Sequence, residues 1–386
     1  MDGAPREAVA RRERAARWAT IALVLLVPAA FLPKVFGSQP EPVGIAPRWA
    51  DLIVITTAAW PSSGERGVPA FDELRLAASR VDQCYAPSRS AAGAAVSLWT
   101  GRFPANHGVR SNKLALPPGA WTLARAEEAS GRRTAAFLED PFVSVTGIGG
   151  FEEVVEDADL GVERVLAAGT DFLASHPDER TCLWLHLSSP GDQAEALARL
   201  VTGIREHLAT STRRFTTLLV VTGLTRPGSP HADGRSRIPI YIQLPAGRAA
   251  GLEGRGAVNL ADVAGALCEL LALPLPSSGD APLQSRGESL WANVNGGGGF
   301  DWQFLEGEHG DVLRFGKTRV APDADGTLTA SMTEFPAFDA RFEPADPSIA
   351  PTLVEQYRVL HKRLEAGATE AIPVEAPAPW SGWRGW

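Results

Sequence analysis

Residues 52–60 read LIVITTAAW, and they begin with six consecutive aliphatic or β-branched residues. Similar runs recur along the chain, and they are too continuously apolar for strands with one face in water, which predicts burial on both faces. Stretches with apolar residues three and four apart alternate with these runs and predict helices. The expected strands are Leu52–Thr57, Arg133–Leu138, Thr181–Leu187, Phe215–Thr222 and Ile238–Leu244, and the expected helices are Asp159–His176, Asp192–Leu208 and Val258–Leu271. This alternation predicts an α/β fold with a mostly parallel central sheet and helices on both faces.

Composition excludes several classes of protein. The chain has 386 residues, of which 45% are hydrophobic and 21% charged, as in ordinary globular proteins. Acidic residues outnumber basic ones by 45 to 37, so the chain lacks the basic field that nucleic-acid binding requires. The three cysteines, Cys84, Cys182 and Cys268, form no CxxC pair. This spacing excludes zinc ribbons, iron–sulfur ligation and a disulfide framework.

An uncharged apolar run lies near the N-terminus. Trp18–Pro33, extended past Lys34 to Phe36, approaches the ~20 residues that span a bilayer. Five arginines precede it, and the positive-inside rule then keeps residues 1–17 in the cytoplasm and places the rest of the chain on the outer side. We therefore predict a single-pass protein of a bacterial-type inner membrane with a periplasmic main domain. The alternatives are a cleaved signal peptide, with Val35 and Gly37 at the cleavage site, and a buried soluble helix.

The expected organisation follows from these features. Residues 18–36 form the transmembrane helix, 37–48 a linker, and 49–295 the α/β domain. After the glycine run near residue 296, a C-terminal subdomain extends to residue 370. It contains a predicted small antiparallel sheet, with a hairpin of Asp311–Pro322 and Gly326–Met332, and a closing helix at Ile349–Gly367.

The last segment, 371–386, is rich in proline and tryptophan. Trp380, Trp383 and Trp386 lie three apart in a Pro/Gly context that permits an extended threefold conformation, which would put the three indoles on one face. This pattern suggests contact with a partner protein or with the lipid headgroup zone, where tryptophan concentrates. The alternative is a frayed terminus.

Several motifs occur in a characteristic order between Asp51 and Leu364. After the first strand come Thr100-Gly101-Arg102-Phe103-Pro104 with Asn106-His107-Gly108, then WTLARAEEASGRRTAAF with Gly150-Phe151, LWLHLSSP, LLVVTGL, SRIPIYIQLP, and VNLADVAGALCELLALPLP with GESLW. In this order and spacing the chain resembles a sulfatase of the alkaline phosphatase superfamily. The resemblance implies a fold built on a mostly parallel sheet.

The chemistry of that family needs a divalent cation held by carboxylates and a nucleophile on the cation, because the metal lowers the nucleophile's pKa and neutralises developing charge. In the resemblance, the first ligand position is Ala58, followed by Ala59, and the next ligand pair falls on Gly223 and Leu224. The nucleophile position, nine residues before Thr100, is Ala91. The neighbouring motif positions are Gly93, Ala94 and Ala95, and Gly191 replaces a substrate-facing histidine.

The resemblance therefore implies a pseudoenzyme: no catalytic residue, no metal ligand and no cofactor. We expect a membrane-anchored accessory subunit of a larger membrane protein assembly, working by protein–protein contact. Asn106 and His107 are expected to be architectural, and His186 to be a core histidine.

Other interpretations remain open. Cys84, Ser88 or Ser90 could be a relocated nucleophile, and His231 with Asp233 could replace lost ligands, although two side chains do not make a cage for a hard cation. The chain could instead bind sulfated or phosphorylated glycans without cleaving them, through residual anion contacts of Arg89, Arg102, Arg110 and His231. A third possibility is an active metal-dependent hydrolase of sulfuric or phosphoric esters.

Overall fold

The computed structural model describes residues 50–61, 68–188, 193–226, 237–254, 256–274, 276, 290, 303–306, 309–315, 318–332, 343–345, 347–366 and 372–373. All of these belong to one compact unit. The predicted transmembrane segment 18–36 and the tryptophans of the C-terminal tail lie outside the described residues. No helix within the described part of the chain combines the length and the hydropathy needed to cross a bilayer.

A mixed sheet forms the centre of the fold, and nine strands of the described residues belong to it. Its order is β10-β2-β8-β7-β1-β6-β4-β5, with β9 paired to β2. Only the pairs of β8 with β2 and with β7 are antiparallel among the described pairings of this sheet. The strand bounds are β1 Asp51–Ala59, β2 Ser79–Tyr85, β4 Arg133–Leu138, β5 Glu153–Glu156, β6 Thr181–Leu187, β7 Thr217–Thr225, β8 Arg237–Gln243, β9 Glu253–Gly254 and β10 Val258–Asn259.

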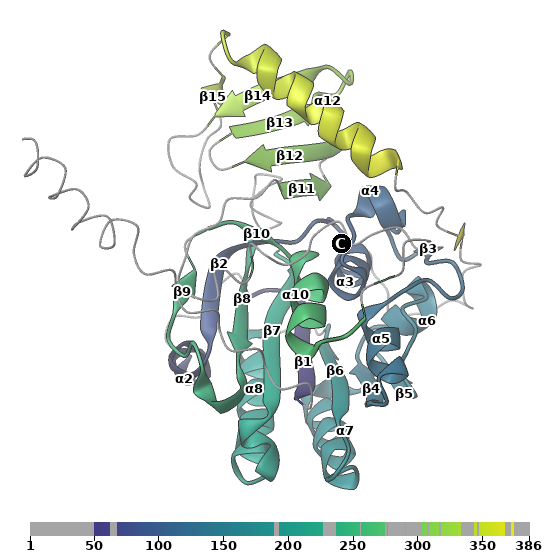
Figure 1. Ribbon diagram of the computed structural model, residues 1–386, viewed down its shortest axis with the longest axis vertical. Helices are drawn as coiled ribbons and strands as arrows, with labels where there is room; N and C mark the ends of the chain where they lie inside the picture. Colours follow the sequence, from purple (N-terminus) through teal and green to yellow (C-terminus); the bar gives the residue numbers. More distant parts are fainter. Residues whose placement is uncertain are drawn as a thin grey trace, which may run out of the picture. The chain divides into compact units, whose positions relative to one another are not determined.

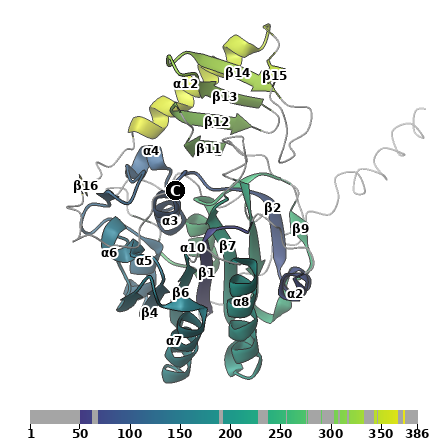
Figure 2. The same cartoon turned by 180° about the vertical axis from the view of Figure 1, so that it is seen from behind.

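Helices cover both faces of this sheet, as the continuous apolar strands predict. Figure 1 shows α10 in front of the strands, and Figure 2, from behind, shows α7 and α8 against the opposite face. The strand β1 is buried along seven of its nine residues, which requires cover on both sides. The helix bounds are α2 Pro69–Ala77, α3 Ala91–Thr100, α4 Pro104–His107, α5 Leu123–Ala129, α6 Phe142–Thr146, α7 Gly161–Ser175, α8 Gln193–Ala209 and α10 Asp262–Leu271.

In two of the expected elements, the first residues belong to a different element in the structure. The predicted strand Phe215–Thr222 begins two residues later, because Thr212–Phe215 form a short 3₁₀ helix, η1, capped by Ser211. The predicted helix Val258–Leu271 begins only at Asp262, because Val258 and Asn259 pair with β2 as strand β10. The Asp262 carboxylate accepts the Asn259 backbone N–H at 2.7 Å and so ends the strand there.

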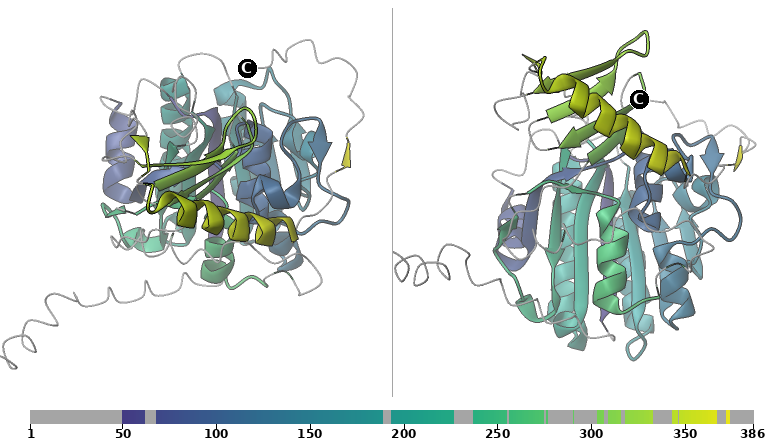
Figure 3. Two further views of the ribbon diagram at one scale, coloured as in Figure 1. Left: turned by 90° about the horizontal axis from the view of Figure 1, so that it is seen from above. Right: turned by 45° about the horizontal axis from the view of Figure 1, so that its top comes forward.

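A second sheet of five antiparallel strands, in the order β11-β12-β13-β14-β15, follows in the sequence. The sequence predicted that Asp311–Pro322 and Gly326–Met332 form one hairpin, which was wrong. In the structure Asp311–Pro322 is itself a hairpin of two strands, and β14 is the third strand. The helix α12, Ala350–Ala366, lies along this small sheet (Figure 3). The strand bounds are β11 Gln303–Glu306, β12 Asp311–Phe315, β13 Thr318–Pro322, β14 Leu328–Met332 and β15 Glu343–Pro344; β3 Leu114–Ala115 pairs separately with β16 Ile372–Pro373.

Apolar contacts attach the small sheet to the α/β domain. Phe304, Leu313 and Tyr357 form one cluster with Phe103, which stands between α3 and α4. The Phe103 and Phe304 rings meet edge to face with centroids 5.8 Å apart. On the other side of the small sheet, Leu305 and neighbouring residues pack on Tyr85 at the end of β2. The small sheet therefore covers the part of the molecule where β2 ends and α3 and α4 begin.

Buried ion pairs lie at the opposite end of the central strands, where β1 starts. Arg213 Nη1 lies 2.5 Å from Asp51 Oδ1, and both side chains are 6% exposed. Arg132 donates to the Ala50 carbonyl and pairs at 2.8 Å with Glu127, whose side chain is fully buried. Because a single buried charge is costly, these pairs hold the chain firmly where it joins β1.

Candidate functional site

The positions at which the resemblance places metal ligands, Ala58, Gly223 and Leu224, lie near the ends of β1 and β7. The two strands are parallel, with Thr57 opposite Gly223 and Ala59 opposite Thr225. The Trp60 N–H donates to the Thr225 carbonyl at 2.7 Å, and the Thr225 hydroxyl donates to the Ala58 carbonyl at 2.7 Å. Backbone pairing thus continues past the ligand positions.

Trp60 fills the space beside Gly223. A Cβ added to Gly223 would lie 2.9 Å from the Trp60 Cβ and 3.1 Å from the Trp60 nitrogen, which is closer than packed atoms tolerate. The Trp60 ring is 1% exposed and stacks on Tyr241, with centroids 6.2 Å apart. Leu224, the neighbouring ligand position, is fully buried. An ionised carboxylate at position 224 would be buried, which is costly unless the charge is paired.

The position of the family nucleophile, Ala91, is the first residue of α3. The Ser90 side chain caps this helix by accepting the Gly93 N–H at 3.0 Å. Ser88 folds over the same turn, because a Cβ on Gly93 would lie 2.4 Å from the Ser88 hydroxyl oxygen. Glycine is therefore required at position 93 for the chain to pass this closely. The start of α3 is covered by residues of its own chain.

A carboxylate of the small sheet lies at this helix start. Glu306, the last residue of β11, accepts from the Ser88 hydroxyl at 2.7 Å and from the Arg89 backbone N–H at 3.0 Å. The Glu306 N–H in turn donates to the Pro87 carbonyl at 2.8 Å. The N-terminus of a helix favours negative charge. Here the chain itself supplies that charge.

The arginines of the expected anion site are placed differently from one another. Arg110 holds Asp311 with a bidentate pair at 2.8 and 3.0 Å and reaches Glu306 at 3.4 Å. Burial favours the neutral form of Asp311, but its hydrogen bonds and charge interactions with Arg110 and His361 outweigh this and lower its pKa. Arg102 is 3% exposed, whereas Arg89 is exposed. Arg110 is therefore already occupied by carboxylates of the small sheet.

His107 is fully buried beneath α3. Its Nδ1 accepts the Val109 N–H at 3.0 Å, so Nε2 carries the proton and donates to the Ser97 hydroxyl at 2.9 Å. Burial, reinforced by the nearby charges of Arg110 and Arg102, lowers the pKa of His107 to about 3. Asn106 beside it is also fully buried. This arrangement gives His107 an architectural role.

A second cluster of buried polar side chains connects the ends of three strands. The sequence predicted only part of this cluster. Trp184 Nε1 donates to the Thr56 hydroxyl at 2.9 Å, and the same hydroxyl is hydrogen-bonded to His186 Nδ1 at 2.7 Å. The other ring nitrogen of His186 donates to Asp140 at 3.1 Å. The order resembles a hydroxyl–imidazole–carboxylate relay, but Thr56 and His186 are fully buried, so the hydroxyl does not meet a substrate. Asp140 follows the strand run 133–138 directly, which is the sequence signal that could have found it.

The remaining candidates divide into buried and undescribed residues. Cys84 is fully buried, and burial raises the pKa of its thiol well above the usual value, which opposes a thiolate nucleophile. His231, Asp233, Gly191 and the tail tryptophans Trp380, Trp383 and Trp386 lie outside the described residues.

Within the described ranges, no group of three or more histidine, cysteine or carboxylate side chains is placed to hold a metal ion. The residues at the end of β1 and β7 do not fit the cation that the fold family implies. A hard cation requires several anionic oxygens, and Ala58, Gly223 and Leu224 offer none from their side chains.

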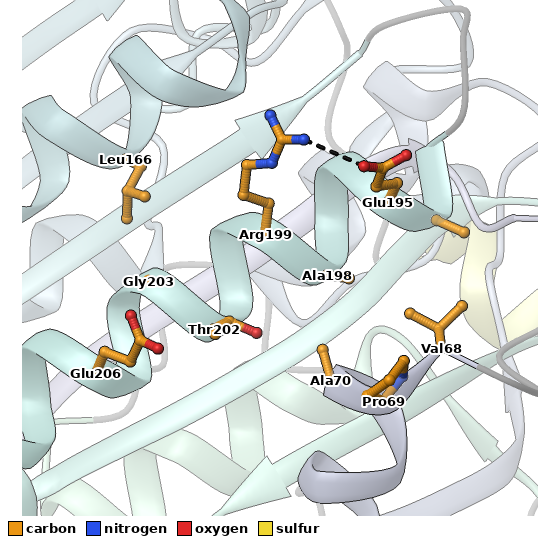
Figure 4. Close-up of a pocket in the computed structure, with 11 residues that line it drawn as sticks. Val68, Pro69, Ala70, Leu166, Glu195, Ala198, Arg199, Thr202, Gly203 and Glu206 are labelled. Carbon is orange, nitrogen blue, oxygen red and sulfur yellow. Dashed lines mark hydrogen bonds and ion pairs between the residues drawn. The ribbon is translucent and has the colours of Figure 1, made fainter.

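A surface groove of about 600 Å³ lies elsewhere, between α2, α7 and α8. Figure 4 shows Leu166, Val68 and Ala70 along it, with Arg199 turned toward Glu195 above α8. Arg199 pairs with Glu163 at 2.8 Å and with Glu195 at 3.2 Å on the surface. None of the residues that line this groove belongs to the candidate site.

The fold was compared with known proteins. No family model matches the chain, and no curated protein matches it. Among solved structures, it is similar to a phosphonate monoester hydrolase from Silicibacter pomeroyi, with a TM-score of 0.64 and 14% identity over 82% of this chain and 96% of that one. A 2-O GAG sulfatase matches with a TM-score of 0.64 and 12% identity, over 82% of this chain and 92% of that one.

A protein of the alkaline phosphatase superfamily from Vibrio parahaemolyticus matches with a TM-score of 0.61 and 13% identity, over 83% of this chain and 90% of that one. At identities this low, the matches are evidence for the fold alone. The chain therefore shares the α/β fold of these solved structures, among them a sulfatase and a protein of the alkaline phosphatase superfamily.

Proposed function

We propose that this chain is a catalytically inactive, sulfatase-like protein that is anchored in a membrane by residues 18–36 and serves as an accessory subunit of a membrane protein assembly. The supporting observation is the continuous pairing of β1 with β7 past Ala58 and Gly223, with Trp60 packed where a ligand side chain would stand. Among the described residues, this part of the molecule offers neither the carboxylates nor the space that a cation needs.

The start of α3 supports the same proposal. The nucleophile position is an alanine, and Glu306 lies against the helix start through Ser88 and the Arg89 backbone. An incoming sulfate or phosphate ester would meet this carboxylate and be repelled by it. The same contact weakens the alternative of a glycan binder, because Arg110 is paired with Asp311 and Glu306.

Metal content tests the inactive state. The full chain, purified in mild detergent and dialysed against Ca²⁺ or Mg²⁺, should retain no stoichiometric divalent ion and should not hydrolyse aryl sulfate or phosphate esters. One equivalent of ion that is lost in His231→Ala or Asp233→Ala, together with ester turnover abolished by a chelator, would overturn the proposal.

The accessory role has a separate test in the C-terminal tail. Cross-linking in native membranes, followed by purification, should recover the full chain with partner proteins. Replacing Trp380, Trp383 and Trp386 together by alanine should weaken that recovery, whereas the neighbouring change Ser381→Ala should not. A chain that purifies as a monomer without a partner in both cases contradicts the proposed role.

A further inference from the structure

An exposed apolar surface lies at the end of the central sheet where β1 begins. Phe215 in η1 is 54% exposed, Leu252 is 38% exposed, and Leu76 near the end of α2 is 77% exposed. Phe215 and Leu76 are more than half exposed, and a contiguous group of exposed apolar side chains marks a contact surface.

These residues belong to one continuous region. The 3₁₀ helix η1 contacts η2, Pro245–Gly247, which leads into the loop 248–252. That loop pairs with the end of α2, because the Gly251 N–H donates to the Ala78 carbonyl and the Arg80 N–H donates to the Leu252 carbonyl. We call residues 76, 212–215 and 245–252 the basal surface.

The composition of the basal surface suits a lipid interface. Between residues 245 and 252 the sequence is PAGRAAGL, so its only charged side chain is Arg248. In η1 the exposed Arg214 lies over the Phe215 ring, 4.2 Å from its centre. Small apolar residues and one aromatic ring, bordered by arginines with long apolar stems, are the combination that enters the headgroup zone while the guanidinium stays at the polar level.

The N-terminal chain reaches the fold beside this surface. The Asp51 N–H donates to the Thr216 carbonyl at 3.1 Å, one residue after Phe215, and Arg213 holds the Asp51 carboxylate. The 13 residues 37–49 separate the apolar run 18–36 from Ala50. Even fully extended, 13 residues reach at most roughly 45 Å.

We propose that the basal surface rests on the phospholipid bilayer in which residues 18–36 are inserted, with Phe215 and Leu252 in the headgroup zone. This inference rests on the proposed membrane anchor. It gives the domain a fixed orientation, in which the start of β1 faces the bilayer. The opposite end of the central strands, which carries the small sheet and α12, then points away from the bilayer and is accessible to partner proteins.

Site-specific labelling of the full chain in phospholipid vesicles tests this orientation. The three native cysteines are fully buried or nearly so, and burial raises the pKa of Cys84, Cys182 and Cys268, so a new surface cysteine is labelled selectively. Phe215→Cys and Leu252→Cys carry an environment-sensitive fluorophore. Val359→Cys, at a 44% exposed apolar position of α12, is the matched control.

Vesicles of phosphatidylcholine and phosphatidylglycerol that contain a lipid-attached quencher should reduce the fluorescence at positions 215 and 252 at least about twofold and leave position 359 unchanged, as expected for headgroup insertion. Flotation of the vesicles reports separately on the anchor. If the chain floats with the vesicles while all three labels stay unquenched, the basal surface inference is wrong and the anchor stands. If the chain does not float, both are overturned.

Discussion

The Cα of Gly223 lies so close to Trp60 that any side chain there would press on the Trp60 backbone: an added Cβ comes within 3.1 Å of its nitrogen. Gly223→Ala should therefore destabilise the protein by about 1–3 kcal/mol, as overpacking of a filled core does. Chemical denaturation measures the change.

Gly169→Ala is the control for that prediction. It is the same exchange at a buried helical glycine whose nearest neighbours are the Leu185 methyl groups at 3.0 and 3.2 Å. These can rotate away, and alanine favours the helix by about 1 kcal/mol, so the change should be near neutral. A Gly223→Ala variant as stable as Gly169→Ala would contradict the tight contact with Trp60.

His107 should not titrate in the folded protein across the physiological range. Its pKa is lowered to about 3, whereas in the unfolded chain it lies near 6.5. Between these values the unfolded state binds the extra proton, so this histidine removes stability as the pH falls from about 6.5 toward 3. NMR of the imidazole nitrogens should show the Nε2–H tautomer unchanged from pH 7 to 5. A protonated ring at pH 5 would contradict the buried contacts to Ser97 and Val109.

Glu127 should give a pH dependence of the opposite sign. Burial raises its pKa to about 7, although Arg132 opposes the shift. The folded state then holds the proton between about 4.5 and 7, so stability decreases as pH rises through that window, by about 1–3 kcal/mol in total. The unfolding free energies of the protein and of Glu127→Gln are measured from pH 4.5 to 8. As the pH rises, the unfolding free energy of the protein should fall relative to that of the variant. Parallel curves would contradict the raised pKa.

The pair of Arg110 with Asp311 should hold the small sheet on the α/β domain. Asp311→Asn loses a charge-assisted bidentate contact, and because the Arg110 side chain is 38% exposed we expect a loss of only about 1–2 kcal/mol. Hydrogen exchange should increase in β11, β12 and α12 before it changes in β1 or β6.

Acidification should act on the same contact. Because the pKa of Asp311 is lowered, its contribution is present above the ordinary carboxyl pKa and is lost as the pH falls through the lowered value. Arg199→Ala, which removes the exposed pairs to Glu163 and Glu195, is the control and should cost clearly less than Asp311→Asn. Equal effects of Asp311→Asn and Arg199→Ala would contradict the attachment.

Strands of mostly apolar residues could be predicted from the sequence, whereas an alternating strand and a two-residue strand could not. Arg133–Leu138 and Thr181–Leu187 were expected with the bounds that the structure has, because both are mostly apolar runs that pair with a strand on each side. The strand β2, SRVDQCY, alternates polar and apolar residues around a bulge and gave no such signal. The two residues of β10 were joined to the helix that follows, since only the Asp262–Asn259 contact separates them.

The positions of the candidate site followed from motif spacing, but their surroundings did not. Spacing placed Ala58, Ala91 and Gly223 at the ends of their elements. It could not reveal that Trp60 fills the space beside Gly223, because that contact joins strands more than 150 residues apart in the chain. For the same reason the partnership of Ser88 and Arg110 with Glu306 and Asp311 depends on how the small sheet packs.

The hydrogen bonds that link Trp60 and Ala58 to Thr225 have a consequence for protein engineering. Aspartates placed at positions 58 and 223 would leave the two strands joined by these hydrogen bonds, with Trp60 packed against position 223. A designed cation site here would therefore require the replacement of Trp60 and a different backbone path after β1, before any choice of ligands could matter.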